Sequence, residues 1–282
     1  MPMTLHAASR EALAAAELRL LELADATQND SILASDDLAK LGEELFAVLG
    51  LLIEQPALRR ALADASSEPA GREQLVRGLF AGKVSDGTLQ VLVAVVTARW
   101  SSPRELVDGV ESLARTALLV RAEREGQLDS TEDELFRLGR IVAGSHELEL
   151  LLADPAGSVD GKVALVDSLI EGKVSPVTKT LVDQLVRHPR GMRVADGLSE
   201  LADLAAKRRQ RSVAHVRSAV ELTAEQIDRL TATLTTIYSR PIALHVEVDP
   251  ALAGGLTIKI GDEIIDGSIA GRLAALRRNL AS

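Results

Sequence analysis

The chain has 282 residues, a formal net charge of −9 and only Phe 3, Tyr 1 and Trp 1 as aromatic residues. Nucleic-acid binding normally needs a basic surface, and single-strand binding needs stacking rings, so both functions are disfavoured. The absence of Cys excludes a disulfide framework, a thiolate metal site and a Cys nucleophile, and it is typical of a reducing, cytoplasmic compartment.

The same composition predicts a mainly helical protein without a membrane span. At about 150 residues per domain, the length predicts roughly two domains. Abundant Ala and Leu with few aromatic residues favour helices over a β-sandwich. The longest stretch without a charged residue, Gly87 to Ala98, has twelve residues, whereas a membrane helix needs about 20. The first twenty residues include Glu11 and Glu17 and do not resemble a secretion signal, so we expect them to be part of the fold.

An amphipathic helix is predicted near residue 41. Its apolar stripe consists of Leu41, Leu45, Val48, Leu49 and Leu52, which fall on one helical face. This stripe must pack against another element.

The first three quarters of the chain contain an internal repeat with an offset of 90 residues. Residues 44–96 and 134–186 align without a gap and share 17 identities in 53 positions. The longest shared run is Gly82–Ser85, which recurs as Gly172–Ser175. We infer a duplicated helical domain, called copy 1 (residues 1–104) and copy 2 (residues 105–211) below.

The shared Gly-Lys-Val-Ser run has two interpretations. It can be a helix–turn–helix joint, in which Gly82 takes a left-handed conformation and Ser85 caps the next helix. It can also be a phosphate-binding loop, which needs Gly five residues before Gly82 and Ser or Thr after the Lys. Those positions hold Arg77 and Val84, so the joint is favoured.

Several helix starts are predicted from capping residues. Ser102-Pro103-Arg104-Glu105 offers a Ser cap, a Pro at the first helical position and a Glu that closes the capping box. Thr131 with Glu134 predicts a second such box, and Ser175-Pro176 opens another helix. A long helix from Ser102 to about Gln127 is expected to be shared by the two copies.

The last quarter, residues 212–282, predicts a small α+β module. Alternating apolar residues predict strands at 242–248 and 256–260, followed by a turn at Gly261-Asp262 into a strand at 263–265. A less regular strand is expected at 213–220. Capping residues predict helices from Thr223 to about Tyr238 and from Ser268 through Ile269, Leu273, Leu276 and Leu280. The basic residues at 207–211 are either an anion site or, as is more common, a solvated helix end.

No motif for catalysis, a cofactor or a metal is found. The five His residues include no pair at a spacing of three or four that would place two imidazoles on one helical face. Gly-x-Ser-x-Gly, His-Glu-x-x-His and Gly-x-Gly-x-x-Gly are absent. The chain is therefore interpreted as an interaction protein.

A signature in the module suggests a family. The run Asp249-Pro250-Ala251-Leu252-Ala253-Gly254-Gly255-Leu256-Thr257-Ile258-Lys259-Ile260-Gly261-Asp262, with Ile265-Asp266-Gly267-Ser268-Ile269 and Arg272–Leu276, resembles the signature of the F-type ATP synthase delta subunit family. The candidate signature residues are Gly254, Gly255, Leu256, Lys259, Gly261, Asp262, Ile265, Asp266, Gly267, Ser268 and Leu273. The helical domain present twice resembles the enlarged form found in actinobacteria.

The resemblance implies a non-catalytic stator subunit without a cofactor. Such a subunit links the alpha/beta head to the peripheral b stalk at the cytoplasmic face of the cell membrane, so that rotor torque is resisted. Its N-terminal domain holds the N-terminal helix of an alpha subunit between its first and fifth helices, and its C-terminal module holds subunit b. A free-standing helical adaptor with a similar module is the alternative, and an enzyme is a third, weaker one.

An apolar groove for a partner helix needs aliphatic residues. The candidates are Leu89, Leu92, Val93 and Val96 in copy 1, and Leu181, Leu185 and Val186 in copy 2. The alternative is that they simply fill the bundle cores. Because the head contains three alpha subunits, the duplication predicts two bound helices per chain, with copy 1 favoured because it begins at the N-terminus as in shorter family members.

In the signature, Gly254 and Gly255 are interpreted as positions whose backbone geometry a side chain would block. Asp266-Gly267-Ser268 is expected to form a turn that caps the last helix. Leu256, Ile265 and Leu273 are expected to be core residues.

Overall fold

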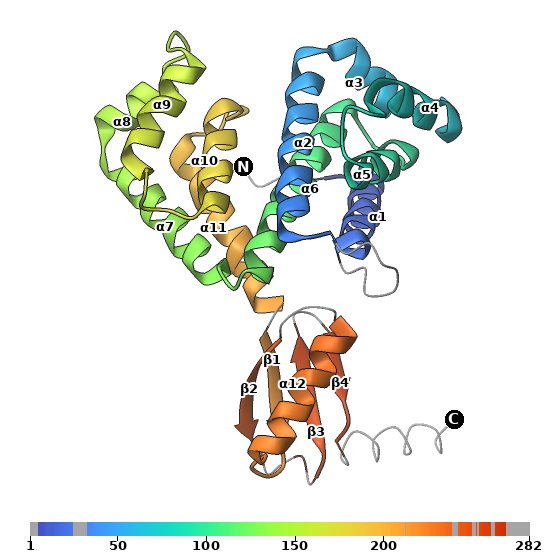
Figure 1. Ribbon diagram of the computed structural model, residues 1–282, viewed down its shortest axis with the longest axis vertical. Helices are drawn as coiled ribbons and strands as arrows, with labels where there is room; N and C mark the ends of the chain where they lie inside the picture. Colours follow the sequence, from blue (N-terminus) through green and yellow to red (C-terminus); the bar gives the residue numbers. More distant parts are fainter. Residues whose placement is uncertain are drawn as a thin grey trace. The chain divides into compact units, whose positions relative to one another are not determined.

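The computed structural model describes residues 5–24, 33–211, 213–238, 242–249, 252, 254–260 and 263–268. The chain divides into two compact units, Met1–Ala205 and Ala206–Ser282. The first unit is helical and the second contains the sheet (Figure 1), which confirms the predicted fold class. The finer division of the helical part at residue 105 stays a prediction.

The repeat is visible in the helices. Four helices of copy 1 have counterparts in copy 2, and three of these pairs begin and end 90 residues apart. The pairs are α2 (Ser35–Glu54) with α7 (Leu128–Gly144), α3 (Pro56–Ala63) with α8 (His146–Ala153), α4 (Pro69–Phe80) with α9 (Val159–Ile170), and α5 (Asp86–Thr97) with α10 (Pro176–Arg187). The remaining helices of this part are α1 (Ala7–Ala24), α6 (Pro103–Arg124) and α11 (Val194–Arg211).

The Gly-Lys-Val-Ser run is a joint between two helices, as predicted. Gly82 has φ +73° and Gly172 has φ +69°, a conformation that side chains disfavour. Ser85 Oγ accepts a hydrogen bond from the Thr88 amide at 3.4 Å, which caps α5. Ser175 caps α10 in the same way, so both copies use one joint.

One predicted helix start is wrong. Helix α7 begins at Leu128, and Thr131 is buried within it. Glu134 accepts hydrogen bonds from the Ser175 amide at 3.0 Å and the Thr178 hydroxyl at 2.5 Å, so it braces the joint of copy 2. Glu44 accepts from the amide and hydroxyl of Ser85 in the corresponding place. The pattern Thr-x-x-Glu misled because the Glu serves a contact 41 residues away.

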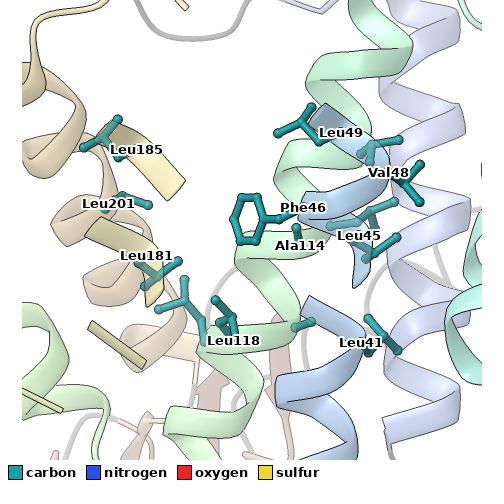
Figure 2. Packing of buried hydrophobic residues seen from close by; sticks show 14 of the residues in the cluster. Leu41, Leu45, Phe46, Val48, Leu49, Ala114, Leu118, Leu181, Leu185 and Leu201 are labelled. Carbon is teal, nitrogen blue, oxygen red and sulfur yellow. The ribbon is translucent and has the colours of Figure 1, made fainter. Parts of the chain in front are cut away.

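Helix α6 lies at the centre of the helical unit. The predicted long helix is confirmed, with Ser102 Oγ accepting from the Glu105 amide at its start. Helix α2 packs along α6 with its stripe Leu41, Leu45, Val48, Leu49 and Leu52 buried. Figure 2 shows the first four of these residues. Burial of such side chains is the main source of stability for a bundle of this kind.

The second unit is a four-stranded mixed sheet with one described helix. The strand order is β2-β1-β3-β4, with β1 parallel to β2 and antiparallel to β3, and β3 antiparallel to β4. The elements are β1 (Val213–Ser218), α12 (Ala224–Tyr238), β2 (Ala243–Val248), β3 (Leu256–Ile260) and β4 (Glu263–Asp266). Leu234 of α12 packs with Val216, Ile258 and Ile260 in a small core. These strands and α12 confirm the predictions.

Two predictions for this unit lie outside the described residues: the turn at Gly261-Asp262 and the helix after Ser268. The basic cluster at 207–211 forms the last turn of α11. Lys207 and Arg209 are exposed there, as a solvated helix end predicts, whereas Arg208 is buried. Within the part of the chain that the structure describes, no helix is long and apolar enough to cross a membrane.

Candidate helix-binding groove

A cavity of about 390 Å³ opens between α1 and α5 of copy 1. Its walls come from α1, from α5 and from the end of α4, and they are Ala15, Leu18, Arg19, Glu22, Arg77, Gln90, Val93 and Ala94. Apolar side chains therefore alternate with charged ones along the same groove.

The polar groups of this groove are paired with one another. Arg19 donates hydrogen bonds to Glu22 Oε2 at 3.0 Å and to Gln90 Oε1 at 2.5 Å, which joins α1 to α5. Arg77 donates to Glu73 at 2.7 Å. Leu18 remains 59% exposed. An exposed apolar surface with charged neighbours suits the apolar face of a partner helix and orients its polar face.

The structure separates the predicted groove residues into two groups. Val93 lines the cavity. The other six are buried in the bundle core, as the alternative interpretation predicted: Leu89, Leu92, Val96, Leu181, Leu185 and Val186. The cavity lies between the first and fifth helices, as the family resemblance implies, but no residue of α1 was among the candidates. The apolar residues of α1 fall on several faces, and only the packing shows that Leu18 is left exposed.

The start of α1 is anchored to α6 by Glu105. This carboxylate accepts a hydrogen bond from the His6 amide at 3.0 Å, and its second oxygen lies 2.7 Å from His6 Nδ1. Burial raises the pKa of Glu105, but hydrogen bonds from the Ser9 hydroxyl, the His6 ring and the His6 amide outweigh burial and lower the pKa to about 2. The anchor therefore depends on an ionised carboxylate.

We expect Glu105→Gln to destabilise the helical unit by about 2 kcal/mol near pH 7, the typical worth of hydrogen bonds to a charged group. Because the folded-state pKa of Glu105 lies below its ordinary value of 4.5, the stabilisation is present above that value and disappears as the pH falls towards 2. Denaturant unfolding of both proteins at several pH values measures this difference. A difference that persists at pH 2.5, or an equal loss for the exposed control Glu43→Gln, would contradict it.

The signature residues of the second unit form a backbone contact between β3 and the end of β4. Gly254 and Gly255 have φ +138° and +77°, as their interpretation requires. The Gly267 amide donates to Leu256 O at 3.0 Å, and Ser268 donates through its amide and hydroxyl to Asp266 Oδ1 at 2.9 and 2.6 Å. The predicted turn at Asp266–Ser268 is therefore present, while the helix that it is predicted to cap lies outside the described residues.

The core assignments in this signature need one correction. Leu256 is half-buried against the small core, whereas Ile265 is 38% exposed. Ile265 lies on β4, an edge strand, where side chains have fewer neighbours. Lys259 is exposed on β3. Gly261, Asp262 and Leu273 lie outside the described residues.

Comparisons with known proteins agree on one family. A family model described as "ATP synthase delta (OSCP) subunit" matches residues 114–280. "ATP synthase subunit delta" of Thermobifida fusca is 47% identical, with 89% of this chain and 94% of that protein covered. The protein of the same name from Rhodococcus opacus is 46% identical over 98% of this chain and 99% of its own.

A solved structure is also similar. One chain of the Toxoplasma gondii mitochondrial ATP synthase hexamer is 22% identical, with 60% of this chain and 95% of that chain covered and a TM-score of 0.32. The family match and the near-full-length relatives are sufficient by themselves: the chain belongs to the ATP synthase delta (OSCP) subunit family.

Proposed function

We propose that the chain is a non-catalytic stator subunit of an F-type ATP synthase, which links the alpha/beta head to the peripheral b stalk so that rotor torque is resisted during ATP synthesis. The observation that carries this proposal is the match to proteins named ATP synthase subunit delta over nearly the whole length of both chains. The complex is membrane-associated, and we place the chain at its cytoplasmic face.

The head contact is assigned to the groove of copy 1. The groove lies between α1 and α5 and combines Leu18, Val93 and Ala94 with paired charged side chains. Its proposed occupant is the N-terminal helix of an alpha subunit, with an apolar face against Leu18 and Val93. This assignment is supported by the shape and chemistry of the groove, because an amphipathic helix in an apolar groove is a common mode of recognition.

The stalk contact is assigned to the second unit. There the Gly267 amide donates to Leu256 O, which joins the end of β4 to β3, and Ser268 bonds to Asp266 at the end of β4. We propose that this unit binds the end of subunit b. The signature residues act through the fold of the unit, and none of them is proposed as a catalytic, cofactor-binding or metal-binding residue.

The test is association of the full chain with a synthetic alpha-subunit N-terminal peptide and with purified subunit b. We expect both to bind and the purified chain to hydrolyse no ATP. Leu18→Glu should lower the affinity for the alpha peptide at least tenfold, because the carboxylate would lose its water against the apolar face of the peptide. The same variant should leave the binding of subunit b unchanged.

Leu150→Glu is the matched control, since Leu150 is 58% exposed on α8, away from the groove residues. It should change neither association. Failure of the wild-type chain to bind either partner, or ATP hydrolysis that accompanies the chain through purification, would contradict the proposed function.

A further inference from the structure

The counterpart of the groove in copy 2 differs in the chemistry of its helix face. Gln90, Val93 and Ala94 of α5 correspond to Thr180, Asp183 and Gln184 of α10, 90 residues further along the chain. Polar Asp183 and Gln184 therefore stand where copy 1 has the aliphatic residues Val93 and Ala94.

Asp183, one of these positions, belongs to a charged cluster with Lys179 and Asp167. Lys179, which replaces Leu89, pairs with Asp183 Oδ2 at 3.0 Å and also with Asp167, which replaces Arg77. A partner helix with an apolar face would remove water from this charged cluster and offer it no hydrogen bond in return, which is costly. The face of α10 is therefore unsuited to the ligand that the copy 1 groove fits.

The second wall of the copy 2 groove is covered by copy 1 itself. In copy 2 the helix packed beside α10 is α6, where copy 1 has α1 beside α5. Helix α2 lies along α6 and also contacts α10. The approach is close, because a Cβ on Gly42 of α2 would lie 2.9 Å from Leu118 of α6, and one on Gly50 would lie 3.6 Å from His188 Nε2 beyond α10.

Phe46 of α2 points towards the side of α6 on which α10 lies (Figure 2). It is 4% exposed, and Figure 2 shows it extending from α2 across α6 on the side of α10, where Leu181 and Leu185 lie. The corresponding residue of copy 2, Phe136, is exposed. Burial of the phenyl ring in copy 1 thus belongs to the contact between the copies and not to the repeat.

Ion pairs of low exposure hold α6 against the other helices of copy 2. Arg190, in the segment after α10, donates to Glu111 Oε2 of α6 at 2.6 Å and pairs with Asp108. Arg115 of α6 donates to Glu111 at 2.5 Å and to Glu200 of α11 at 3.1 Å. Separation of α6 from α11 and from the segment after α10 would leave these charges without partners, at a cost of several kcal/mol.

We propose that the second groove is occupied by the chain's own helix α2, so that the duplicated domain binds one partner helix per chain, in copy 1. The duplication by itself predicts two sites. The charged face of α10, and helix α2 packed over α6 and against α10, argue for one. The inference rests on the proposed function, since it concerns the same alpha-subunit helix. The family model matches residues 114–280, which include most of copy 2 and none of copy 1. The experiment therefore has to distinguish a site in copy 1 from a site in copy 2.

The experiment is calorimetric titration of the full chain with the alpha-subunit N-terminal peptide. We expect one peptide per chain. Val93→Asp, which gives copy 1 the residue of copy 2, should weaken binding at least tenfold, whereas Asp183→Val, which makes the reverse exchange, should leave affinity and stoichiometry unchanged. Circular dichroism checks that both variants are folded, and Leu18→Glu at an exposed groove position is the second variant for copy 1.

Two peptides per chain in the wild type would overturn the inference while leaving the proposed function intact. The same holds if Asp183→Val alters binding and Val93→Asp and Leu18→Glu do not, because the site would then lie in copy 2. No binding to the wild-type chain would overturn the proposed alpha contact, and the inference with it.

Discussion

Gly255→Val is expected to unfold the second unit and to abolish its binding of subunit b. Gly255 has φ +77°, and a Cβ there would lie 2.5 Å from Gly267 O, 3.0 Å from Ser268 Cα and 3.2 Å from Gly267 C. All three atoms belong to the backbone, so no side chain can rotate away. A β-branched residue also strains a positive φ.

The backbone around Gly255 cannot shift without further losses. Its carbonyl accepts from the Ala219 amide at 3.3 Å, and the Gly267 amide donates to Leu256 O at 3.0 Å. Strain and clash together should cost about 3 kcal/mol or more, which is large for a unit with a small core. Thermal unfolding followed by circular dichroism, with a parallel measurement of binding to subunit b, tests this.

Gly82→Val is the matched control for the conformational part. Gly82 has a similar φ of +73°, but a Cβ there meets nothing within 4 Å. This variant should be destabilised only by the cost of placing a side chain in the left-handed conformation, about 1–2 kcal/mol. It should still bind subunit b. Equal losses in the two variants would show that the contact with Gly267 is unimportant, and an unchanged Gly255→Val would refute the backbone argument.

Arg72→Ala should produce the second large effect, a loss of about 3–5 kcal/mol in the stability of the helical unit. The Arg72 side chain is buried, and its guanidinium donates only to backbone carbonyls: Val96 O at 2.6 Å, Asp64 O at 2.5 Å, Ser67 O at 2.8 Å, and Thr97 and Ala98 O at 3.3 and 3.4 Å. It thereby joins the end of α5 to the turn before α4.

Removal of this side chain takes the Arg72 donor from Val96 O in a buried place and from the other carbonyls in partly buried ones. A buried acceptor left without a donor costs more than the bond itself contributes. Because α5 is a wall of the candidate groove, we expect Arg72→Ala to weaken the binding of the alpha-subunit peptide as well. Denaturant midpoints and peptide titration measure the two effects. Arg72→Lys should recover only part of the stability, since an ammonium cannot reproduce the planar fork of donors.

Copy 2 supplies the control for Arg72. Lys162 is the residue 90 positions later, and it donates one hydrogen bond, to Asp154 O at 2.6 Å, from an exposed setting. Lys162→Ala should therefore cost less than about 1 kcal/mol. A loss as large as that of Arg72→Ala, or a negligible loss for Arg72→Ala, would contradict the proposed bracing of α5.

Local features of this chain were predictable because they depend on a few neighbouring residues. The caps at Ser85, Ser102 and Ser175, the left-handed Gly82 and Gly172, and the strand periodicity in the last quarter are all present in the structure. The apolar stripe at Leu41–Leu52 likewise identified a buried face before its partner α6 was known.

Features that involve several elements were decided only by the tertiary structure. The Thr131–Glu134 pattern was misread because Glu134 braces a joint in the next helix hairpin, and Ile265 is exposed because β4 became an edge strand. Of the four groove residues predicted on α5, Val93 lines the cavity and the other three are buried in the core, since periodicity shows that a helix has an apolar side but not where another helix leaves it uncovered.

The two copies show the same difference between local features, which the sequence predicts, and features that depend on tertiary packing. Sequence identity at the joint determined that both would fold alike, because caps and turns act within a few residues. Whether a repeat offers a groove depended on what packs beside it: α1 leaves Leu18 and Val93 open in copy 1, while α2 covers α6 in copy 2. Burial is a property of neighbours in space, and no residue of α10 carries that information alone.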